Sequence, residues 1–554
     1  MAETSLLPLG QSSFKTLRDA GLIYVDKTDL VASIAKMRSP FFLSRPRRFG
    51  KSLLLSTFES LFKDGTKYFQ GLKLESLWQE DKTYRVLKID FSGEMGSETP
   101  VAELDRVLRD KIRDFAALHG VTFQDNWSDY TAAQLLERVA QECWGELVLL
   151  VDEYDYALSH ALGNKPRFEA FRSYLQNFFG KVKECQGAFR FIFITGISRF
   201  SHTSIFSQLN NLDDLSLNGA YATLLGYTGA ELREYFDEYV ADAAVQLACT
   251  KDLIYEGLRL NYDSFRLSDE SEDQVYNPWS ILNFMRYPKR GYRSYWYESG
   301  GLFPTLVIKY LRHALAKEQA QAPEAGQVPT EPYRRLESLP FDRRQLSVSY
   351  DYFEIPPAVL LFQTGYLTIR EVPDADGVPM LRLMPPNLEV NSNLAALYLE
   401  EVRDKPIDVD VINACQSAAR FFAQEDLGKI RVIFNHALNS FGYDAAVLFK
   451  YEAMCRDVIR LVLTLSALSA KAEVISAQGR CDLVVETPAL RYVFEFKLAR
   501  TKTEAAEAAA LEDAVSQLKD QRYGEILPVK RLIKVAVVIS TPKREIVKFE
   551  TVVA

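Results

Sequence analysis

The sequence predicts an α/β protein of several domains, with a parallel sheet near the N-terminus and a second, smaller α/β domain at the C-terminus. Between Phe41 and about Thr195, short apolar stretches alternate with amphipathic helical stretches, a pattern typical of a parallel sheet. The chain has 554 residues. Because a single hydrophobic core stops growing near roughly 250–300 residues, we expect about two to four domains.

The order of apolar and polar stretches gives the expected elements. In the first domain we expect strands at 41–43, 86–89, 147–151 and 189–194, with helices that include 53–62 and 135–143. A mostly helical stretch follows, with one amphipathic helix at 231–246. After a segment rich in Ala, Pro, Gln and Glu at 317–340, a helix at 356–364 and strands at 366–371 and 380–384 suggest a winged-helix-like unit. The C-terminal domain is expected to contain helices at 452–468 and 505–519 and strands at 472–475, 481–486, 492–497 and 533–539.

These elements predict five consecutive segments. They are a parallel-sheet core (1–225), a helical lid subdomain (226–316), a linker or exposed loop (317–345), a winged-helix-like or helical connector (346–440) and a C-terminal α/β domain (441–554).

Composition narrows the class of protein. With 47% hydrophobic and 25% charged residues, the chain is typical of a globular protein. The net charge of -8 gives no overall attraction to nucleic acid, so binding there would need local basic surfaces. The six cysteines form no CxxC pair, which suits a reducing compartment. Since there is no secretory signal pattern and no apolar stretch of about eighteen residues, we expect a cytoplasmic protein without a membrane segment.

A phosphate-binding loop is expected where the first strand meets the next helix. Gly50, Lys51 and Ser52 open that helix. Free N–H groups at a helix N-terminus face phosphates, a lysine there can reach the phosphate oxygens, and a serine hydroxyl can ligate magnesium. The same tripeptide also occurs at helix starts that bind nothing, and Arg45 stands where a full GxxxxGK[ST] motif has glycine. The residues expected to contact the nucleotide here are Arg45, Arg48, Phe49, Gly50, Lys51, Ser52 and Leu53.

A second acidic element supports the nucleotide site. The apolar stretch 147–151 ends at Asp152 and Glu153, where a Walker B strand would bring Asp152 to magnesium and Glu153 to the attacking water. The alternative is a buried strand followed by a solvated acidic turn. The next strand ends at Thr195, which can sense the γ-phosphate, and Arg199 can stabilise transition-state charge, although arginines after strands are usually solvated.

Several motifs together resemble the bacterial AAA-ATPase-like family. They are YVDKT at 24–28, RPRRFGKS at 45–52, DEYD at 152–155, GISRF at 196–200, NNL at 210–212, YAT at 221–223 and YNP at 276–278. The resemblance covers roughly residues 5–285, and arginine in place of the first Walker glycine is usual in that family. It implies a P-loop ATPase related to AAA and STAND-type proteins, which uses ATP and Mg²⁺, and a C-terminal domain of nuclease type.

The C-terminal domain carries a second acidic cluster. Glu495 and Lys497 leave the same face of one strand, and a hairpin would bring Asp482 near them. Two carboxylates that share a divalent metal, with a lysine to activate water, suffice for phosphodiester cleavage. Such residues are also ordinary surface pairs.

With Glu452, Glu473 and Gln517, this cluster resembles the PD-(D/E)XK nuclease superfamily. The resemblance implies that Asp482 and Glu495 bind Mg²⁺ or Mn²⁺ with support from Glu452, that Lys497 positions water, and that Gln517 orients the strand or water.

The sequence thus favours an ATPase whose nucleotide state regulates a metal-dependent nuclease acting on nucleic acid, with DNA expected rather than RNA. A second hypothesis is a STAND-like ATP-driven switch whose C-terminal module binds nucleic acid without cleaving it. A third is a mobile-element or phage-defence accessory whose nuclease needs a partner. The sequence leaves open whether the chain forms a homo-oligomer.

Overall fold

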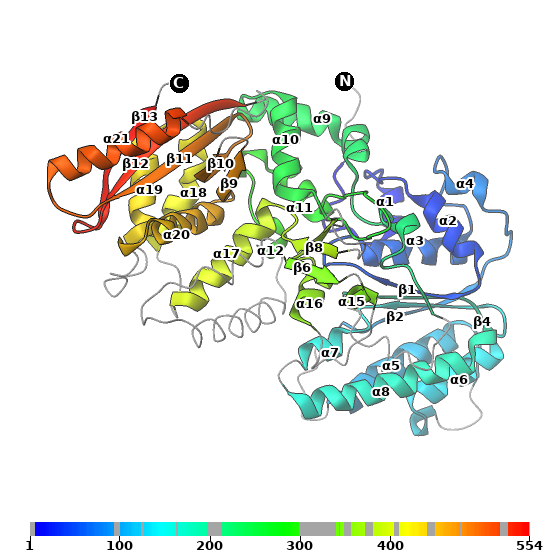
Figure 1. Ribbon diagram of the computed structural model, residues 1–554. Coiled ribbons are helices and arrows are strands. Elements are labelled where there is room, and N and C mark those ends of the chain that lie inside the picture. The colour runs from blue at the N-terminus through cyan, green and yellow to red at the C-terminus, as the bar shows by residue number, and fades with distance from the viewer. Residues whose placement is uncertain are drawn as a thin grey trace. The chain divides into compact units, whose positions relative to one another are not determined.

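The computed structural model describes residues 6–92, 100–122, 127–161, 164–197, 212–298, 339–342, 344–347, 356–371, 380–403, 409–439, 449–476, 479–520 and 530–552 (Figure 1). The chain divides into two compact units, each built from separate segments. Unit 1 contains residues 1–239, 264–286 and 340–383, and unit 2 contains 240–263, 287–339 and 384–554. The segments of the two units alternate along the chain, so this division does not test the five consecutive segments expected from the sequence, which stay a prediction.

Unit 1 is built on a five-stranded sheet with the order β2-β3-β4-β1-β5. Its strands are β1 (Pro40–Ser44), β2 (Arg85–Asp90), β3 (Leu147–Asp152), β4 (Phe189–Gly196) and β5 (Asp213–Asp214). All the pairings are parallel, and the four strands expected from the sequence are confirmed. Every residue of β1, β3 and β4 is buried, which explains their continuous apolar runs.

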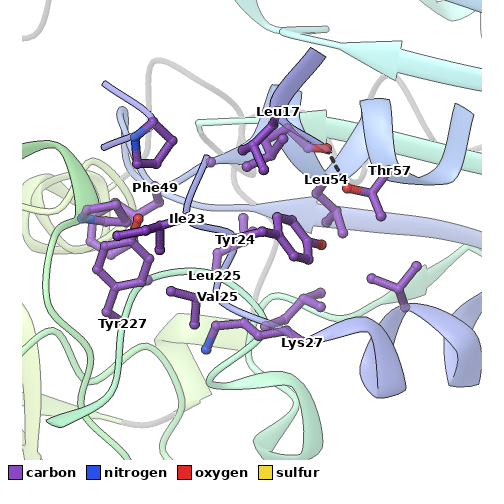
Figure 2. Close-up of a pocket in the computed structure, with 17 residues that line it drawn as sticks. Leu17, Ile23, Tyr24, Val25, Lys27, Phe49, Leu54, Thr57, Leu225 and Tyr227 are labelled. Atoms are coloured by element: carbon purple, nitrogen blue, oxygen red, sulfur yellow. Dashed lines mark hydrogen bonds between the residues drawn. The ribbon is translucent and has the colours of Figure 1, made fainter. Parts of the chain in front are cut away.

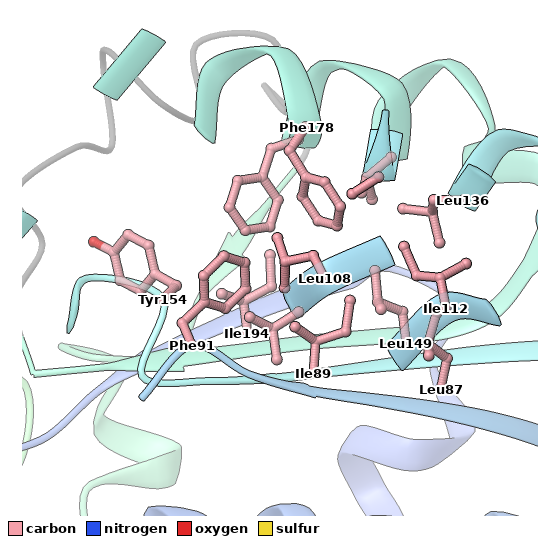
Figure 3. Packing of buried hydrophobic residues seen from close by; sticks show 14 of the residues in the cluster. Leu87, Ile89, Phe91, Leu108, Ile112, Leu136, Leu149, Tyr154, Phe178 and Ile194 are labelled. Atoms are coloured by element: carbon pink, nitrogen blue, oxygen red, sulfur yellow. The ribbon is translucent and has the colours of Figure 1, made fainter. Parts of the chain in front are cut away.

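Helices cover both faces of this sheet (Figure 1). One layer contains α1 (Phe14–Asp19), α2 (Thr28–Lys36), α3 (Lys51–Asp64) and α4 (Leu74–Leu77), and the other contains α5 (Pro100–Leu118), α6 (Ala132–Glu142), α7 (Tyr156–His160) and α8 (Lys165–Glu184). In the second layer, Leu108, Ile112 and Phe178 point toward Leu149 and Ile194 of the sheet (Figure 3). This packing fixes the carboxyl ends of the strands, where the polar residues lie.

The helical stretch after the sheet is present in the described residues. It contains α9 (Gly229–Leu247), α10 (Lys251–Tyr262), α11 (Pro278–Arg286) and α12 (Tyr295–Glu298). Unit 1 also contains a three-stranded sheet with the order β6-β8-β7, formed by β6 (Leu339–Asp342), β7 (Thr368–Glu371) and β8 (Met380–Met384), with α15 (Arg344–Ser347) and α16 (Pro357–Gln363) nearby in sequence. The expected helix and strand pair are found, whereas β6 was not anticipated. Most of the expected linker lies outside the described residues.

Unit 2 contains a second five-stranded sheet with the order β13-β12-β11-β10-β9. Its strands are β9 (Ser469–Ser476), β10 (Gly479–Glu486), β11 (Leu490–Ala499), β12 (Arg531–Ser540) and β13 (Glu545–Val552). Only β11 and β12 pair in parallel; the other pairings among the described strands are antiparallel. The sequence correctly predicts β9 to β12 but not β13.

Besides α10 and α12, the described part of unit 2 contains five further helices. They are α17 (Leu388–Arg403), α18 (Val409–Ala423), α19 (Leu427–Asn439), α20 (Glu452–Leu465) and α21 (Glu504–Asp520). Helix α20 packs against β9, β10 and β11, and α21 packs against β11, β12 and β13. Among the described residues, no helix is long and apolar enough to cross a membrane.

Candidate active sites

The predicted phosphate loop joins β1 to α3. Gly50 is the residue before the helix and has φ +100°, a left-handed conformation that glycine adopts without strain. Because the first N–H groups of a helix have no acceptor within the helix, those of α3 are available to an anion. Lys51 is buried at 7% exposure, and its Nζ donates to the carbonyl oxygens of Arg45 (2.9 Å) and Pro46 (3.0 Å).

Arg45 and Arg48 were both predicted to contact the nucleotide, but their guanidinium groups contact other parts of the protein. The Arg45 guanidinium is buried and donates to the carbonyl oxygens of Ser44 (3.0 Å), Ser216 (2.7 Å) and Tyr221 (3.2 Å). Its charge is therefore committed to the protein, and only its backbone remains in the loop. Arg48 has φ +65°, and its guanidinium lies 4.4 Å from the ring centroid of Trp279.

The two remaining residues predicted in the loop region are apolar. Phe49 is buried and packs edge-on against Phe265, with the ring centroids 5.0 Å apart. Leu53 lies in the first turn of α3. Both line an apolar cavity described below, and neither has a polar side chain that could contact a phosphate.

The predicted acidic pair lies at the carboxyl end of β3. Asp152 is 4% exposed, and its Oδ1 accepts hydrogen bonds from Thr195 Oγ1 (2.8 Å) and from the Glu153 N–H (3.1 Å). Burial is the main cause that raises the pKa of Glu153, while Lys51 opposes the rise. Burial lowers the pKa of Lys51, and Asp152 and Glu153 oppose this. The structure thus brings Lys51, Asp152, Glu153 and Thr195 together, with Ser52 in the first turn of α3; Arg199 lies outside the described residues.

Two residues near this site had no role in the sequence prediction. Asp155 is 1% exposed and accepts the Ile197 N–H at 3.1 Å through Oδ2. Gly196 packs directly against Tyr154 and Asp155. A Cβ added at Gly196 would stand 2.5 Å from Tyr154 Cε1 and 2.8 Å from Asp155 Oδ1. The carbonyl oxygen of Gly196 accepts the Arg45 N–H at 3.3 Å. Gly196 therefore joins the phosphate loop to the acidic turn, a role that only the contact distances reveal.

An apolar cavity lies beside Gly50 (Figure 2). Its volume is about 90 Å³ and it opens partly to solvent, so it is smaller than the roughly 300–1,000 Å³ usual for small-molecule sites. Its lining includes Tyr24, Val25, Lys27, Leu225 and Tyr227 in addition to Phe49 and Leu53. The Lys27 amine donates to both Glu231 carboxylate oxygens (2.7 and 2.8 Å) and to the Thr223 carbonyl oxygen (2.6 Å). No local sequence pattern indicates this cavity, because its wall comes from segments about 200 residues apart in sequence.

The second cluster lies on the β10–β11 hairpin of unit 2. Leu483 pairs with Phe494, which sets Asp482 beside Glu495. Asp482 Oδ2 accepts the Phe496 N–H at 2.9 Å. Lys497 Nζ lies 3.1 Å from Glu495 Oε1 and 3.7 Å from Glu452 Oε1. The structure thus brings Glu452, Asp482, Glu495 and Lys497 together, while Gln517 lies partly buried on α21, which packs against β11.

Among these carboxylates, Glu495 has the pKa that burial raises most. It is 1% exposed, and its Oε2 has no hydrogen-bond partner. Burial first, and then the neighbouring Asp482, raises the pKa of Glu495 to about 8, while Lys497 opposes the rise. Burial also raises the pKa of Glu452, whereas that of Lys497 is raised by Glu495 and Glu452 against the effect of its own burial.

A buried carboxylate oxygen without a donor fits a divalent cation. In the described ranges, no group of three or more His, Cys, Asp or Glu side chains is arranged to enclose a metal ion. The candidate donors are Asp482 and Glu495, and Glu452 lies 3.7 Å from Lys497 Nζ. One or two carboxylates completed by water and phosphate oxygens are the usual ligands of Mg²⁺. The residues at this site fit such an ion.

Comparisons with known proteins agree with both resemblances. Residues 8–206 match the family model described as predicted AAA-ATPase, and residues 450–550 match the PD-(D/E)XK nuclease superfamily. Both matches stand in the order that the sequence predicts.

One relative matches along almost the whole chain. The uncharacterized protein in the vnfD 5′ region of Azotobacter chroococcum mcd 1 is 29% identical over 528 residues, which cover 94% of this chain and 93% of the relative. Among solved structures, the Aeropyrum pernix Orc1 protein in complex with DNA is matched over 66% of this chain and 90% of that chain, with 12% identity and a TM-score of 0.22. A likeness this low carries no argument.

Proposed function

We propose that this chain, in which a domain similar to predicted AAA-ATPases precedes a domain similar to PD-(D/E)XK nucleases, is an ATPase whose nucleotide state regulates a metal-dependent nuclease. The observation that carries the proposal is the buried, partnerless Oε2 of Glu495 beside Asp482 and Lys497. The expected substrate is nucleic acid, with DNA rather than RNA, and the expected location is the cytoplasm, where the six free cysteines stay reduced.

In the N-terminal domain, each residue has a role that its position allows. The Lys51 amine exchanges its two carbonyl partners for phosphate oxygens, and the Ser52 hydroxyl and Asp152 would hold a magnesium ion. Glu153 accepts a proton from the attacking water, a task helped by its raised pKa. Thr195 fixes the Asp152 carboxylate through its hydroxyl.

In the C-terminal domain, Asp482 and Glu495 would hold a magnesium or manganese ion, with Glu452 in support. When bound, such an ion supplies charge stabilisation at the scissile phosphate and lowers the pKa of its water. Lys497 favours the ionised form of Glu495 through the 3.1 Å contact, against the effect of burial, and can orient the attacking water. Gln517 is proposed to orient β11 or the water.

Cleavage is tested with the full chain and with Glu495→Gln, which keeps the shape of the side chain. The parent protein is expected to cleave labelled DNA in Mg²⁺ or Mn²⁺, and the variant is expected to lose cleavage by at least about 100-fold, since a metal ligand is removed. Lys502→Gln, a substitution of an exposed lysine in the same unit, is the control. Cleavage by Glu495→Gln at the parent rate would refute the nuclease.

Regulation is tested through the other domain. Lys51→Ala is expected to abolish ATP hydrolysis, and cleavage in this variant should no longer respond to ATP. Cleavage that responds equally to ATP in the parent and in Lys51→Ala would refute the regulatory part. The STAND-like alternative predicts instead that the parent binds DNA in a salt-dependent way without cleaving it in either metal.

A further inference from the structure

A buried arginine lies behind the acidic cluster of unit 2. Arg456 is 5% exposed and stands one turn after Glu452 on α20, so both side chains face the sheet. Its Nε lies 3.1 Å from Asp457 Oδ1, and its Nη1 lies 3.3 Å from Glu473 Oε1 and 3.8 Å from Asp482 Oδ1. Its Nη2 is buried without a partner. A guanidinium left partly unsatisfied in the interior costs stability, so a purely structural role would favour a better-satisfied side chain.

The sheet is irregular where this arginine meets it. Cys481 pairs with Val474 and Leu483 pairs with Ala472, so the same register sets Asp482 directly opposite Glu473. No pairing is formed between these two residues, and Glu473 has φ +52°, which is unfavourable for a residue with a side chain. Like charges directly opposite on neighbouring strands repel. The Arg456 guanidinium contacts both carboxylates and offsets that repulsion.

Both oxygens of the Asp482 carboxylate therefore have a neighbour that orients them. Its Oδ2 accepts the Phe496 N–H, and its Oδ1 faces Arg456. We infer that Arg456 is a positioning residue of the proposed nuclease: with Glu473 it orients Asp482 for the metal and takes no part in binding the substrate. This inference rests on the proposed function of the same site.

The chain offers a matched control on the same helix. Arg460 is 2% exposed and also faces Asp457, with Nε 4.0 Å from Oδ1. No contact between Arg460 and either Glu473 or Asp482 is found among the described ion pairs. Replacing either arginine removes a buried charge, so both replacements should lower stability, but only a change at Arg456 should disturb Asp482.

The experiment compares the full-length parent with Arg456→Gln, Arg456→Lys and Arg460→Gln in the absence of nucleotide. Mn²⁺ affinity is measured by calorimetry, DNA affinity without metal by fluorescence anisotropy, cleavage in Mn²⁺ by gel assay, and folding by thermal melting. Glu495→Gln gives the baseline for metal binding outside the nuclease site.

For Arg456→Gln we expect Mn²⁺ affinity and cleavage to fall by about 10-fold or more, as is usual when a residue that orients a metal ligand is lost. DNA affinity without metal should stay within about twofold, and Arg456→Lys should recover most of the cleavage, since an ammonium can still contact a carboxylate. Arg460→Gln should melt earlier yet keep the Mn²⁺ affinity of the parent.

Three outcomes would overturn the inference. One is a parent-like Mn²⁺ affinity in Arg456→Gln, and another is an equal loss in Arg460→Gln, which would assign the effect to folding. The third is a large loss of DNA affinity without metal, which would make Arg456 a substrate-binding residue. A parent that neither binds Mn²⁺ above the Glu495→Gln baseline nor cleaves DNA would refute the nuclease itself, and the inference with it.

Discussion

Replacing Gly196 with alanine should damage the proposed ATPase site through a single added methyl group. Its Cβ would stand 2.5 and 2.6 Å from two ring carbons of Tyr154 and 2.8 Å from Asp155 Oδ1. Tyr154 is fully buried, with its ring packed edge-on against Phe42 at 5.5 Å, so it has no open space to enter. Forcing extra volume into such packing costs about 1–3 kcal/mol. For a domain of this size, the melting temperature should fall by roughly 2–10 °C.

The same displacement should also lower ATP hydrolysis. Asp155 accepts a hydrogen bond from the Ile197 N–H, and the Gly196 carbonyl oxygen accepts one from the Arg45 N–H at the start of the phosphate loop. A shift of the strand end therefore moves both Asp155 and the phosphate loop. We expect ATP hydrolysis to fall by at least about tenfold, because small misplacements of reacting groups have effects of that order. Gly229→Ala is the control, since an added Cβ there meets nothing within 4 Å. A Gly196→Ala protein with the melting temperature and ATP hydrolysis of the parent would refute this reasoning.

Further predictions concern charges. The folded-state pKa of Glu495, about 8, lies above the ordinary 4.5, so its contribution to the stability of the metal-free protein is full below about pH 4.5 and is lost as pH rises toward 8. Mn²⁺ binds the ionised form, so the increase in melting temperature on adding Mn²⁺ without nucleotide should be larger at pH 8 than at pH 6, and Glu495→Gln should lose this difference; an equal increase in the variant would contradict it. Arg45→Met removes the donor to three carbonyl oxygens and should lower the free energy of unfolding by about 2–3 kcal/mol. An unchanged denaturant midpoint in chemical denaturation would contradict this prediction. Asp155→Asn should cost about 1–2 kcal/mol, since a charged acceptor becomes neutral, and should lower ATP hydrolysis; unchanged ATP turnover would speak against its link to the site.

Local pattern was enough to predict much of the fold. Strand β3 is a continuous apolar run that ends in two acids, and both its burial on two faces and the position of Asp152 follow from that run. The β10–β11 hairpin likewise follows from the turn near Thr487 and the apolar runs at 483–485 and 492–494 on either side. These features depend on neighbours in the sequence, which is why they were predictable.

Other features depend on contacts between distant residues. The direction of the Arg45 side chain is set by Ser216, 171 residues later, and no local pattern marks it. Glu473 is left-handed, and its side chain pairs with Arg456 of another element, a contact that no local pattern marks. Strand β13 lies at the edge of its sheet, and its exposed and buried residues do not alternate cleanly, so its periodicity was too weak to predict.

The bonds of Arg45 also bear on synthesis of the chain. The guanidinium that anchors the start of the phosphate loop has two of its three acceptors at Ser216 and Tyr221, and the third is the carbonyl oxygen of Ser44. While the ribosome has released only the first 200 residues or so, this arginine lacks the first two acceptors, although every strand of the sheet except the short β5 is already complete. The loop therefore acquires its anchored form late in translation. A fragment that ends at residue 206, where the family match ends, should form most of the sheet and yet bind ATP poorly.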